Sequence, residues 1–342
     1  MPAKAKDRPV LLVGSIPLSS VEEVFEQVSS WLGQLVRRIP DGEIGDRATW
    51  ISWQRHAFKE TQGLIAAGER KGADGTLYPR YAVETTPANV KFPALGYAQE
   101  ALASYRIFAA LRDEGKIAAG TRFQVSLPTP LAVVFAHVMP DAQKAIWPRY
   151  ESRLFAEVDQ IAREIPQRDL AIQWDIAVEI NGILEVPEVL KRYSWDDVIA
   201  GIARAADHVP ENIELGLHLC YGDPGHKHVL EPRDTGLMVE MANRLNNAIR
   251  RPVTWLHMPV PRDRDDESYF APLANLRIAK DTEIYLGLVH LTDGIDGAKR
   301  RLTPAQKFIS DFGIATECGF GRRARNTIPA LLALHREIAT LR

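Results

Sequence analysis

The stretch Leu170-Ala-Ile-Gln-Trp-Asp-Ile-Ala-Val178 decides the fold class together with Ile213-Glu-Leu-Gly-Leu-His-Leu-Cys220. Each is a short, mostly apolar run, which is typical of a strand buried on both faces of a sheet. Residues 189–207 between them repeat apolar side chains with the period of a helix. Two buried strands joined through a helix form a parallel βαβ unit, so the sequence predicts an α/β protein with a parallel sheet.

The same alternation of short apolar runs and amphipathic stretches continues along the whole chain. The predicted strands are residues 10–16, 35–39, 123–127, 170–178, 213–220, 253–258, 284–291 and 313–317. The predicted helices are residues 20–32, 94–114, 147–165, 189–207, 235–250, 269–276, 303–311 and 326–341. Such units in 342 residues predict a (β/α)8 TIM barrel that forms a single catalytic domain over 1–342. Residues 48–93 are expected to be an insertion after the second strand, with Gly72-Ala-Asp-Gly75 as a turn.

The composition excludes several classes of protein. The chain is 46% hydrophobic and 25% charged, with a formal net charge of -2, so nothing attracts it generally to nucleic acid or to an anionic membrane. We expect no signal peptide and no membrane span, because no long uncharged apolar stretch occurs. The sequence therefore predicts a cytoplasmic protein with small-molecule partners, and it leaves the oligomeric state open.

The chain has 2 cysteines, and both follow apolar runs. Residues two apart on a strand point to the same face, so His218 and Cys220 are able to bind one ion together. Cys318, which ends another run, is a candidate to complete the site. Two thiolates and an imidazole suit zinc better than magnesium or calcium. The alternative is that the cysteines are small buried hydrophobic residues, since free cysteine is often buried.

Polar or metal-binding side chains occur at the ends of most of the predicted strands. In a (β/α)8 barrel the carboxyl ends of the strands and the loops that follow them carry the reactive groups, while packed side chains fill the interior. The sequence therefore predicts a functional site at this rim, built from Ser15, Glu43, Asp175, His218, Cys220, His257, His290 and Cys318.

Short motifs along nearly the whole chain carry a family resemblance. They are Val13-Gly-Ser-Ile-Pro17, Asp41-Gly-Glu43, Gln173-Trp-Asp175, His218-Leu-Cys-Tyr221 and Glu317-Cys-Gly-Phe320. In these motifs and in their order the chain resembles the UROD/MetE-like barrel superfamily, and within it the C-terminal catalytic barrel of cobalamin-independent methionine synthase.

The resemblance implies a zinc-dependent transfer of a methyl or other alkyl group to a small thiol such as homocysteine. It implies that zinc is held by His218, Cys220 and Cys318, because zinc keeps a thiol deprotonated at neutral pH. It also implies that the amino-acid end of the thiol lies against Ser15, Glu43 and Asp175. The alternative for these three residues is a structural role in turns and caps.

The sequence departs from the family pattern on two strands. Where the family has a glutamate ligand on the sixth strand, this chain has His257, which would be the fourth zinc ligand if there is one. The alternatives are a neighbour such as Glu317 or an open coordination position. Where the family has an aspartate on the seventh strand, this chain has His290, either an acid that protonates the leaving group or a buried histidine of the interior.

Further residues have open roles. His226 and His228 are either loop residues or alternative ligands, and Arg322, Arg323 and Arg325 either bind an anionic group of a carrier or form an exposed basic run. Trp50, Trp53 and Trp174 either stack on a flat donor or fill space. The donor itself stays open, folate-like or other. Alternative functions are a metal-independent lyase of the uroporphyrinogen decarboxylase type, a zinc hydrolase or lyase, and a noncatalytic protein that binds a thiol or metabolite.

Overall fold

A curled parallel sheet forms the centre of the protein, in a computed structural model that describes residues 7–71, 75–222 and 231–341. Its seven strands follow the order β1-β4-β5-β6-β7-β8-β9, and every neighbouring pair is parallel. This confirms the predicted α/β class with a parallel sheet. The strands are β1 (Arg38–Pro40), β4 (Arg122–Pro128), β5 (Leu170–Ile176), β6 (Glu214–Leu219), β7 (Trp255–Pro259), β8 (Glu283–Gly287) and β9 (Gly313–Ile314).

Residues 10–16, predicted as the first strand, do not form a regular strand. Val10 forms isolated parallel bridges with both Val36, just before β1, and Ile314 of β9. The Leu11 amide also donates a hydrogen bond to the Ile314 carbonyl at 2.9 Å. Pairing stays short because β1 and β9 are themselves only 3 and 2 residues long. The segment lies between the two edge strands of the sheet, an arrangement compatible with a TIM-like barrel.

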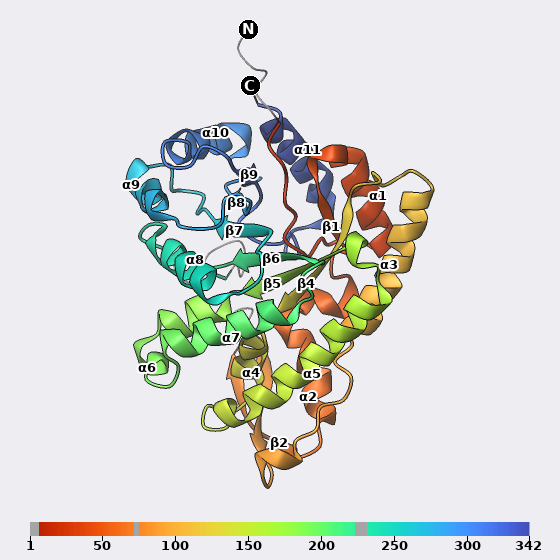
Figure 1. Cartoon of the computed structure of the whole chain (residues 1–342), viewed down its shortest axis with the longest axis vertical. Coiled ribbons are helices and arrows are strands. Elements are labelled where there is room, and N and C mark those ends of the chain that lie inside the picture. The colour runs from red at the N-terminus through yellow and green to blue at the C-terminus, as the bar shows by residue number, and fades with distance from the viewer. Residues whose placement is uncertain (1–6, 72–74, 223–230, 342) are drawn as a thin grey trace.

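Helices surround the sheet (Figure 1). The longer ones are α1 (Val21–Leu32), α3 (Tyr97–Asp113), α5 (Gln143–Glu164), α7 (Trp195–His208), α8 (Gly236–Ala248), α10 (Gly294–Ala305) and α11 (Ile328–Ala339). Shorter elements are η1 (Gly33–Leu35), α4 (Pro130–His137), η4 (Gln167–Asp169), η5 (Glu179–Leu184), α6 (Pro187–Leu190), α9 (Glu267–Phe270), η6 (Ala271–Asn275) and η7 (Arg325–Thr327). None of the described helices combines the length and apolar character that a membrane crossing requires.

Local signals explain where several helices begin. The Ser20 side chain caps α1 by accepting a hydrogen bond from the Glu23 amide, and Ser194 and Asp197 form a reciprocal capping box at α7. Six of the predicted helices, those that start at residues 20, 94, 147, 189, 235 and 326, correspond to α1, α3, α5, α7, α8 and α11. The helix predicted over 269–276 is divided between α9 and η6.

The helix predicted over 303–311 is wrong, because α10 runs over Gly294–Ala305. Glycine disfavours helix interiors, so Gly294 and Gly297 hid this helix in the sequence. The structure needs Gly297, since a Cβ there would lie 1.9 Å from the Asp293 carboxylate. That carboxylate pairs at 2.7 Å with the fully buried Arg301 of α10, which fixes the helix next to the end of β8.

Between β1 and α3 the chain forms η2 (Gly45–Gln54), α2 (Arg55–Glu60), the antiparallel hairpin β2 (Leu64–Lys71) and β3 (Leu77–Val83), and η3 (Pro87–Asn89). The hairpin, which the sequence did not predict, projects at the lower end of Figure 1. The turn expected at Gly72-Ala-Asp-Gly75 falls mostly outside the described residues.

The interior of the curled sheet is filled near the amino ends of the strands. Trp255 is buried there in a small cluster with Leu11, Ala171, Tyr285 and Ala315. Gly216 on β6 makes room for the indole, because a Cβ at this position would lie 1.8 Å from it. Arg38 stacks over the indole at 4.3 Å and pairs with Glu283 at 2.9 Å. Side chains alternate between the two faces of a strand, so those two and four residues after this cluster also point into the interior. They lie close to one another at the carboxyl ends of the strands.

Candidate functional site

Asp175, His218 and His257 form a row across three adjacent strands at the carboxyl ends. Asp175 of β5 is in register with His218 of β6, which is in register with His257 of β7. All three side chains are buried, with exposed fractions of 7%, 2% and 0%. The alternation that places Ala171 and Trp255 inside the sheet also turns these polar side chains inward.

His218, Cys220 and Cys318 lie together at this end. One ligand atom from each residue falls within 4.8 Å of the others, and the two Sγ atoms are 3.8 Å apart. Two thiolates at about 2.3 Å from a tetrahedral zinc ion lie about 3.8 Å apart, so the sulfur spacing suits zinc. The Gly222 amide lies 3.2 Å from Cys220 Sγ and donates a hydrogen bond to it. The chemistry and spacing of these three donors therefore fit the metal expected from the sequence.

His257 lies behind His218 instead of among these donors. Its Nε2 is 3.0 Å from the Thr316 carbonyl oxygen, and its Nδ1 is 2.7 Å from Nδ1 of His218. Burial lowers the pKa of His257 to about 4 and lowers the pKa of His218 well below its ordinary value. Both rings are therefore neutral at physiological pH.

Ser15 is held tightly against the loop that carries Cys318. Its carbonyl accepts a hydrogen bond from the Phe320 amide at 2.6 Å. Gly319 and Gly321 flank the hydroxyl so closely that Cβ atoms there would lie 2.5 and 2.8 Å from Ser15 Oγ. This close approach requires glycine on both sides and joins the first segment of the chain to the last sheet strand at the site.

Glu43 extends from a strained turn after β1. Its φ angle is 51°, and its amide donates to Asp41 Oδ1 at 3.0 Å. Gly42 adopts φ 82°, and a Cβ there would lie 2.7 Å from a methyl group of Val24, so the turn needs glycine. Burial, and then the negative charge of Asp41, raise the pKa of Glu43 to about 7. Strained backbone of this kind is typical of functional sites.

Asp175 is the second carboxylate of the site, and its side chain is buried. Gln173 Nε2 donates to Asp175 Oδ1 at 2.8 Å and to the Val13 carbonyl at 2.7 Å, which fixes β5 against the first segment. Burial, followed by the charge of Glu43, raises the pKa of Asp175 well above its ordinary value. Two neighbouring carboxylates with raised pKa values favour a positively charged ligand group between them.

One cavity brings these parts together. It is lined by Ser15, Glu43, Trp50, Asp175, His218, Cys220, Cys318, Gly319, Gly321 and Arg322, among others. The structure thus places the expected substrate-binding residues Ser15, Glu43 and Asp175 beside the expected metal-binding residues.

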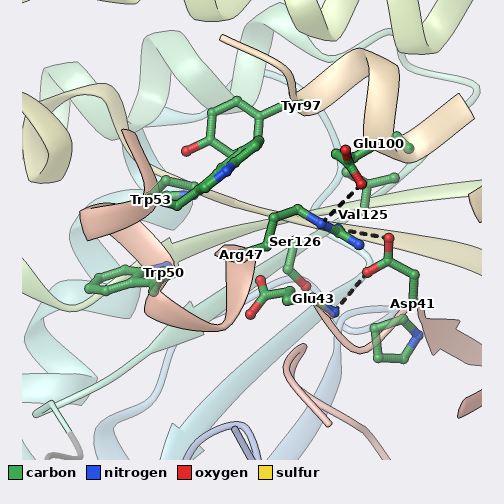
Figure 2. Close-up of a pocket in the computed structure, with 12 residues that line it drawn as sticks. Asp41, Glu43, Arg47, Trp50, Trp53, Tyr97, Glu100, Val125 and Ser126 are labelled. Carbon is green, nitrogen blue, oxygen red and sulfur yellow. Dashed lines mark hydrogen bonds and ion pairs between the residues drawn. The ribbon is translucent and has the colours of Figure 1, made fainter. Parts of the chain in front are cut away.

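A second cavity shares Glu43 and Trp50 with the first (Figure 2). Trp53 and Tyr97 lie on one side of it, and Arg47 extends across it to Asp41 and Glu100, at 2.8 and 3.5 Å. Arg47 was not among the residues predicted from the sequence. Trp50 also has a positive φ angle, 51°. Among the non-glycine residues that the structure describes, only Trp50 and Glu43 have a positive φ. Strain at Trp50 was invisible in the sequence.

His290 is buried beside the site with both ring nitrogens near protein oxygens. Its Nε2 donates to the Val260 carbonyl at 2.9 Å, and its Nδ1 lies 3.6 Å from a Glu317 carboxylate oxygen. Burial lowers the pKa of His290 despite the opposing effect of Glu317. This environment resembles that of an interior histidine, one of the two alternatives expected from the sequence.

The other residues with open roles in the sequence lie in different parts of the structure. Arg322 lines the first cavity, whereas Arg325 pairs with Glu23 of α1 at 2.9 Å. Trp174 is fully buried on β5, so it fills space. His226 and His228 lie outside the described residues.

Comparison with known proteins shows the fold. No protein-family model matches the sequence, and no curated protein matches it. Solved structures with a similar fold include a B12-independent methionine synthase from Shewanella sp. W3-18-1 in complex with selenomethionine and a putative vitamin-B12 independent methionine synthase from Listeria monocytogenes. The TM-scores are 0.65 and 0.59, with 14% identity in both. Each match covers 98% of this chain, and 97% and 98% of the respective neighbour.

Proposed function

We propose that the protein transfers a methyl or other alkyl group to the sulfur of a small amino thiol, with homocysteine as the default acceptor and zinc as the metal. The curled sheet would be a (β/α)8 barrel, with residues 48–93 inserted after its second strand. The observation that carries the proposal is the cavity in which His218, Cys220 and Cys318 converge next to Glu43 and Asp175.

Zinc held by His218, Cys220 and Cys318 would lower the pKa of an incoming thiol and keep it as a thiolate at neutral pH. The thiolate sulfur of the acceptor would then attack the alkyl carbon in line. The new S–C bond forms while the bond from carbon to the donor breaks, and the donor leaves with the electron pair.

The protein residues orient the acceptor. Glu43 and Asp175 would bind its ammonium group, because burial and a neighbouring negative charge raise the pKa of each carboxyl group, and a cation placed between them would stabilise both carboxylates. Ser15, and Arg322 at the cavity wall, would bind its carboxylate. One structural neighbour contains selenomethionine, the selenium analogue of a methylated thiol, which supports an acceptor of this class.

We assign to His290 the role, expected from the sequence, of the acid that protonates the leaving group. Its hydrogen bond to Val260 and its contact with Glu317 would have to open for that step. A His290→Gln variant tests the assignment: loss of the alkaline limb in the pH profile of kcat, where a general acid would lose its proton, supports it, and an unchanged profile rejects it.

Zinc analysis combined with a thiol methylation assay tests the function. We expect about one zinc per chain, and methylation of homocysteine by a folate-like or simpler methyl donor. His218→Ala should lose both properties, while His208→Ala, whose partly exposed ring pairs with Asp159 at 2.9 Å, serves as the matched control. Absence of stoichiometric zinc, together with activity that survives His218→Ala, would overturn the proposal.

A further inference from the structure

We propose that His257 is a positioning residue that accepts a hydrogen bond from His218, and that it is not a metal ligand. Only His218, Cys220 and Cys318 would then bind the metal, and the fourth coordination position would stay open for the substrate sulfur. This inference rests on the proposed zinc-dependent function and specifies the coordination at its centre.

The contacts of His257 determine which nitrogen carries its proton. Thr316 presents a carbonyl oxygen at 3.0 Å from Nε2, and a carbonyl oxygen only accepts hydrogen bonds. In the neutral ring the proton is therefore on Nε2, and Nδ1 is left as an acceptor. The ring of His218 lies at Nδ1, at 2.7 Å, and the Leu219 backbone also forms a hydrogen bond with the His257 ring.

The tautomer of His218 follows from that of His257. Nδ1 of His257 carries no proton, so the short contact requires Nδ1–H of His218 to donate across the 2.7 Å gap. Nε2 of His218 is then the unprotonated nitrogen, which is the form that binds a metal ion. Thr316 thus fixes His257, and His257 in turn fixes His218.

The same contacts keep His257 out of the coordination shell. Binding through Nδ1 would break the contact with His218, and binding through Nε2 would break the hydrogen bond to Thr316. His257 is fully buried at the middle of β7, so its ring has little room to turn. The three remaining donors are the ligand set of a catalytic zinc site, which keeps one position for substrate.

A neutral acceptor has a chemical consequence. Metal-binding histidines commonly donate their second N–H to a carboxylate or a carbonyl oxygen, and a carboxylate makes the ring a more electron-rich ligand. An imidazole acceptor adds no negative charge behind His218. We therefore expect a more electrophilic metal that polarises an incoming thiol more strongly.

X-ray absorption of the zinc-loaded protein tests the coordination directly. We expect two sulfur ligands and one imidazole, with a light atom completing the shell in the absence of thiol and a third sulfur appearing when homocysteine is added. The spectrum of His257→Leu should retain the single imidazole. Two imidazoles in the parent protein, one of which disappears in His257→Leu, would overturn the inference.

Metal affinity provides a second readout with a matched pair of variants. His257→Leu removes the acceptor, so the zinc affinity measured by chelator competition should fall about 10- to 100-fold, the usual effect of losing such a contact. His257→Gln offers an amide oxygen to His218 and should recover part of this loss. Equal affinities for the parent and both variants would contradict the positioning role.

Nitrogen NMR on 15N-histidine-labelled protein requires no variant and therefore does not depend on the folding of a mutant. In the zinc-loaded parent, His257 should show a proton on Nε2, and His218 a proton on Nδ1 with metal on Nε2. Metal on either nitrogen of His257 would overturn the inference while leaving zinc-dependent alkyl transfer intact. A protein that binds no zinc would instead overturn the proposed function.

Discussion

The Sγ atoms of Cys220 and Cys318 lie 3.8 Å apart, although 98 positions separate these residues in the chain. Neither residue forms a disulfide. A disulfide places its sulfur atoms about 2.0 Å apart, so a modest local shift would allow the two residues to bond. A metal ion held between them would prevent that reaction.

Removal of metal should therefore make the cysteine pair sensitive to oxidation. The metal is first removed with a chelator, and the folded protein is then treated with a mild oxidant. When the protein is afterwards unfolded for thiol counting, we expect the number of free thiols to have fallen from two to zero, with a mass loss of about 2 Da for one disulfide. Zinc-loaded protein should keep both thiols under the same treatment, and a reductant should restore metal binding. Two free thiols in the oxidised, metal-free protein would refute this expectation.

The packing of Gly319 against Ser15 predicts a large effect of a single methyl group. In Gly319→Ala the Cβ would lie 2.5 Å from Ser15 Oγ, so we expect a loss of about 1–3 kcal/mol in the free energy of unfolding and weaker zinc binding. Gly120→Ala is the control, because nothing lies within 4 Å of that Cβ.

Adding Ser15→Ala to Gly319→Ala should relieve part of the clash. The hydroxyl is gone in the double variant, although the Ser15 amide still lies 3.1 Å from the new Cβ. Urea unfolding and chelator competition measure the two effects. Strictly additive losses would show that the clash with the hydroxyl is not the cause.

The raised pKa of Glu43 predicts a specific pH dependence of stability. A carboxyl group whose pKa rises from 4.5 to about 7 on folding binds its proton more tightly in the folded state. The folded protein therefore loses stability as the pH rises through this interval. The glutamine side chain of Glu43→Gln cannot ionise, so the variant should be more stable than the parent at pH 8. After allowance for the partial exposure of this side chain, we expect a gain on the order of 1–2 kcal/mol in the free energy of unfolding, which shrinks towards pH 5.

Unfolding curves between pH 5 and pH 8 measure this difference. Glu100→Gln is a suitable control, because its side chain lines the neighbouring cavity but is 42% exposed. A difference between Glu43→Gln and the parent that does not vary with pH would contradict the prediction. Glu43→Gln should also raise KM for the amino thiol, since the ammonium group loses one of its two carboxylates.

Arg38 is expected to stabilise the fold without contributing to the site. It is 2% exposed, stacks over Trp255, and pairs with Glu283 and Glu214 at the opposite end of the sheet interior. Arg38→Met leaves two partly buried carboxylates without their partner, so unfolding should become easier by about 2–4 kcal/mol. Zinc affinity should stay within about twofold, and a large loss of zinc would show that the two ends of the interior are coupled.

Much of the architecture could be predicted from the sequence because buried strands leave a clear apolar signal. The runs around Gln173 and Leu217 appear as β5 and β6, within two residues of the predicted limits. Residues 10–16 do not form the predicted strand, because a regular strand needs continuous hydrogen bonding to a neighbouring strand. The short strands on either side form only isolated bridges with Val10 and its neighbours.

The candidate site was predictable to the same extent. The position of His218, Cys220 and Cys318 at strand ends predicted their convergence, and the structure brings them together. Arg47 was not predictable, because its place depends on the path of the chain after the strained Glu43. The contact between His257 and His218 was also hidden, since a sequence places two histidines on neighbouring strands without showing which ring nitrogens face each other.

Val10 and Ser15 also bear on how the protein matures during synthesis. They contact residues 314 and 320, which leave the ribosome some 300 residues later. An incomplete nascent chain carries His218 and Cys220 but neither Cys318 nor the partners of its own first segment. The three residues proposed to bind zinc are therefore present together only once translation has passed the end of β9, so capture of that metal would wait until the whole sheet is available.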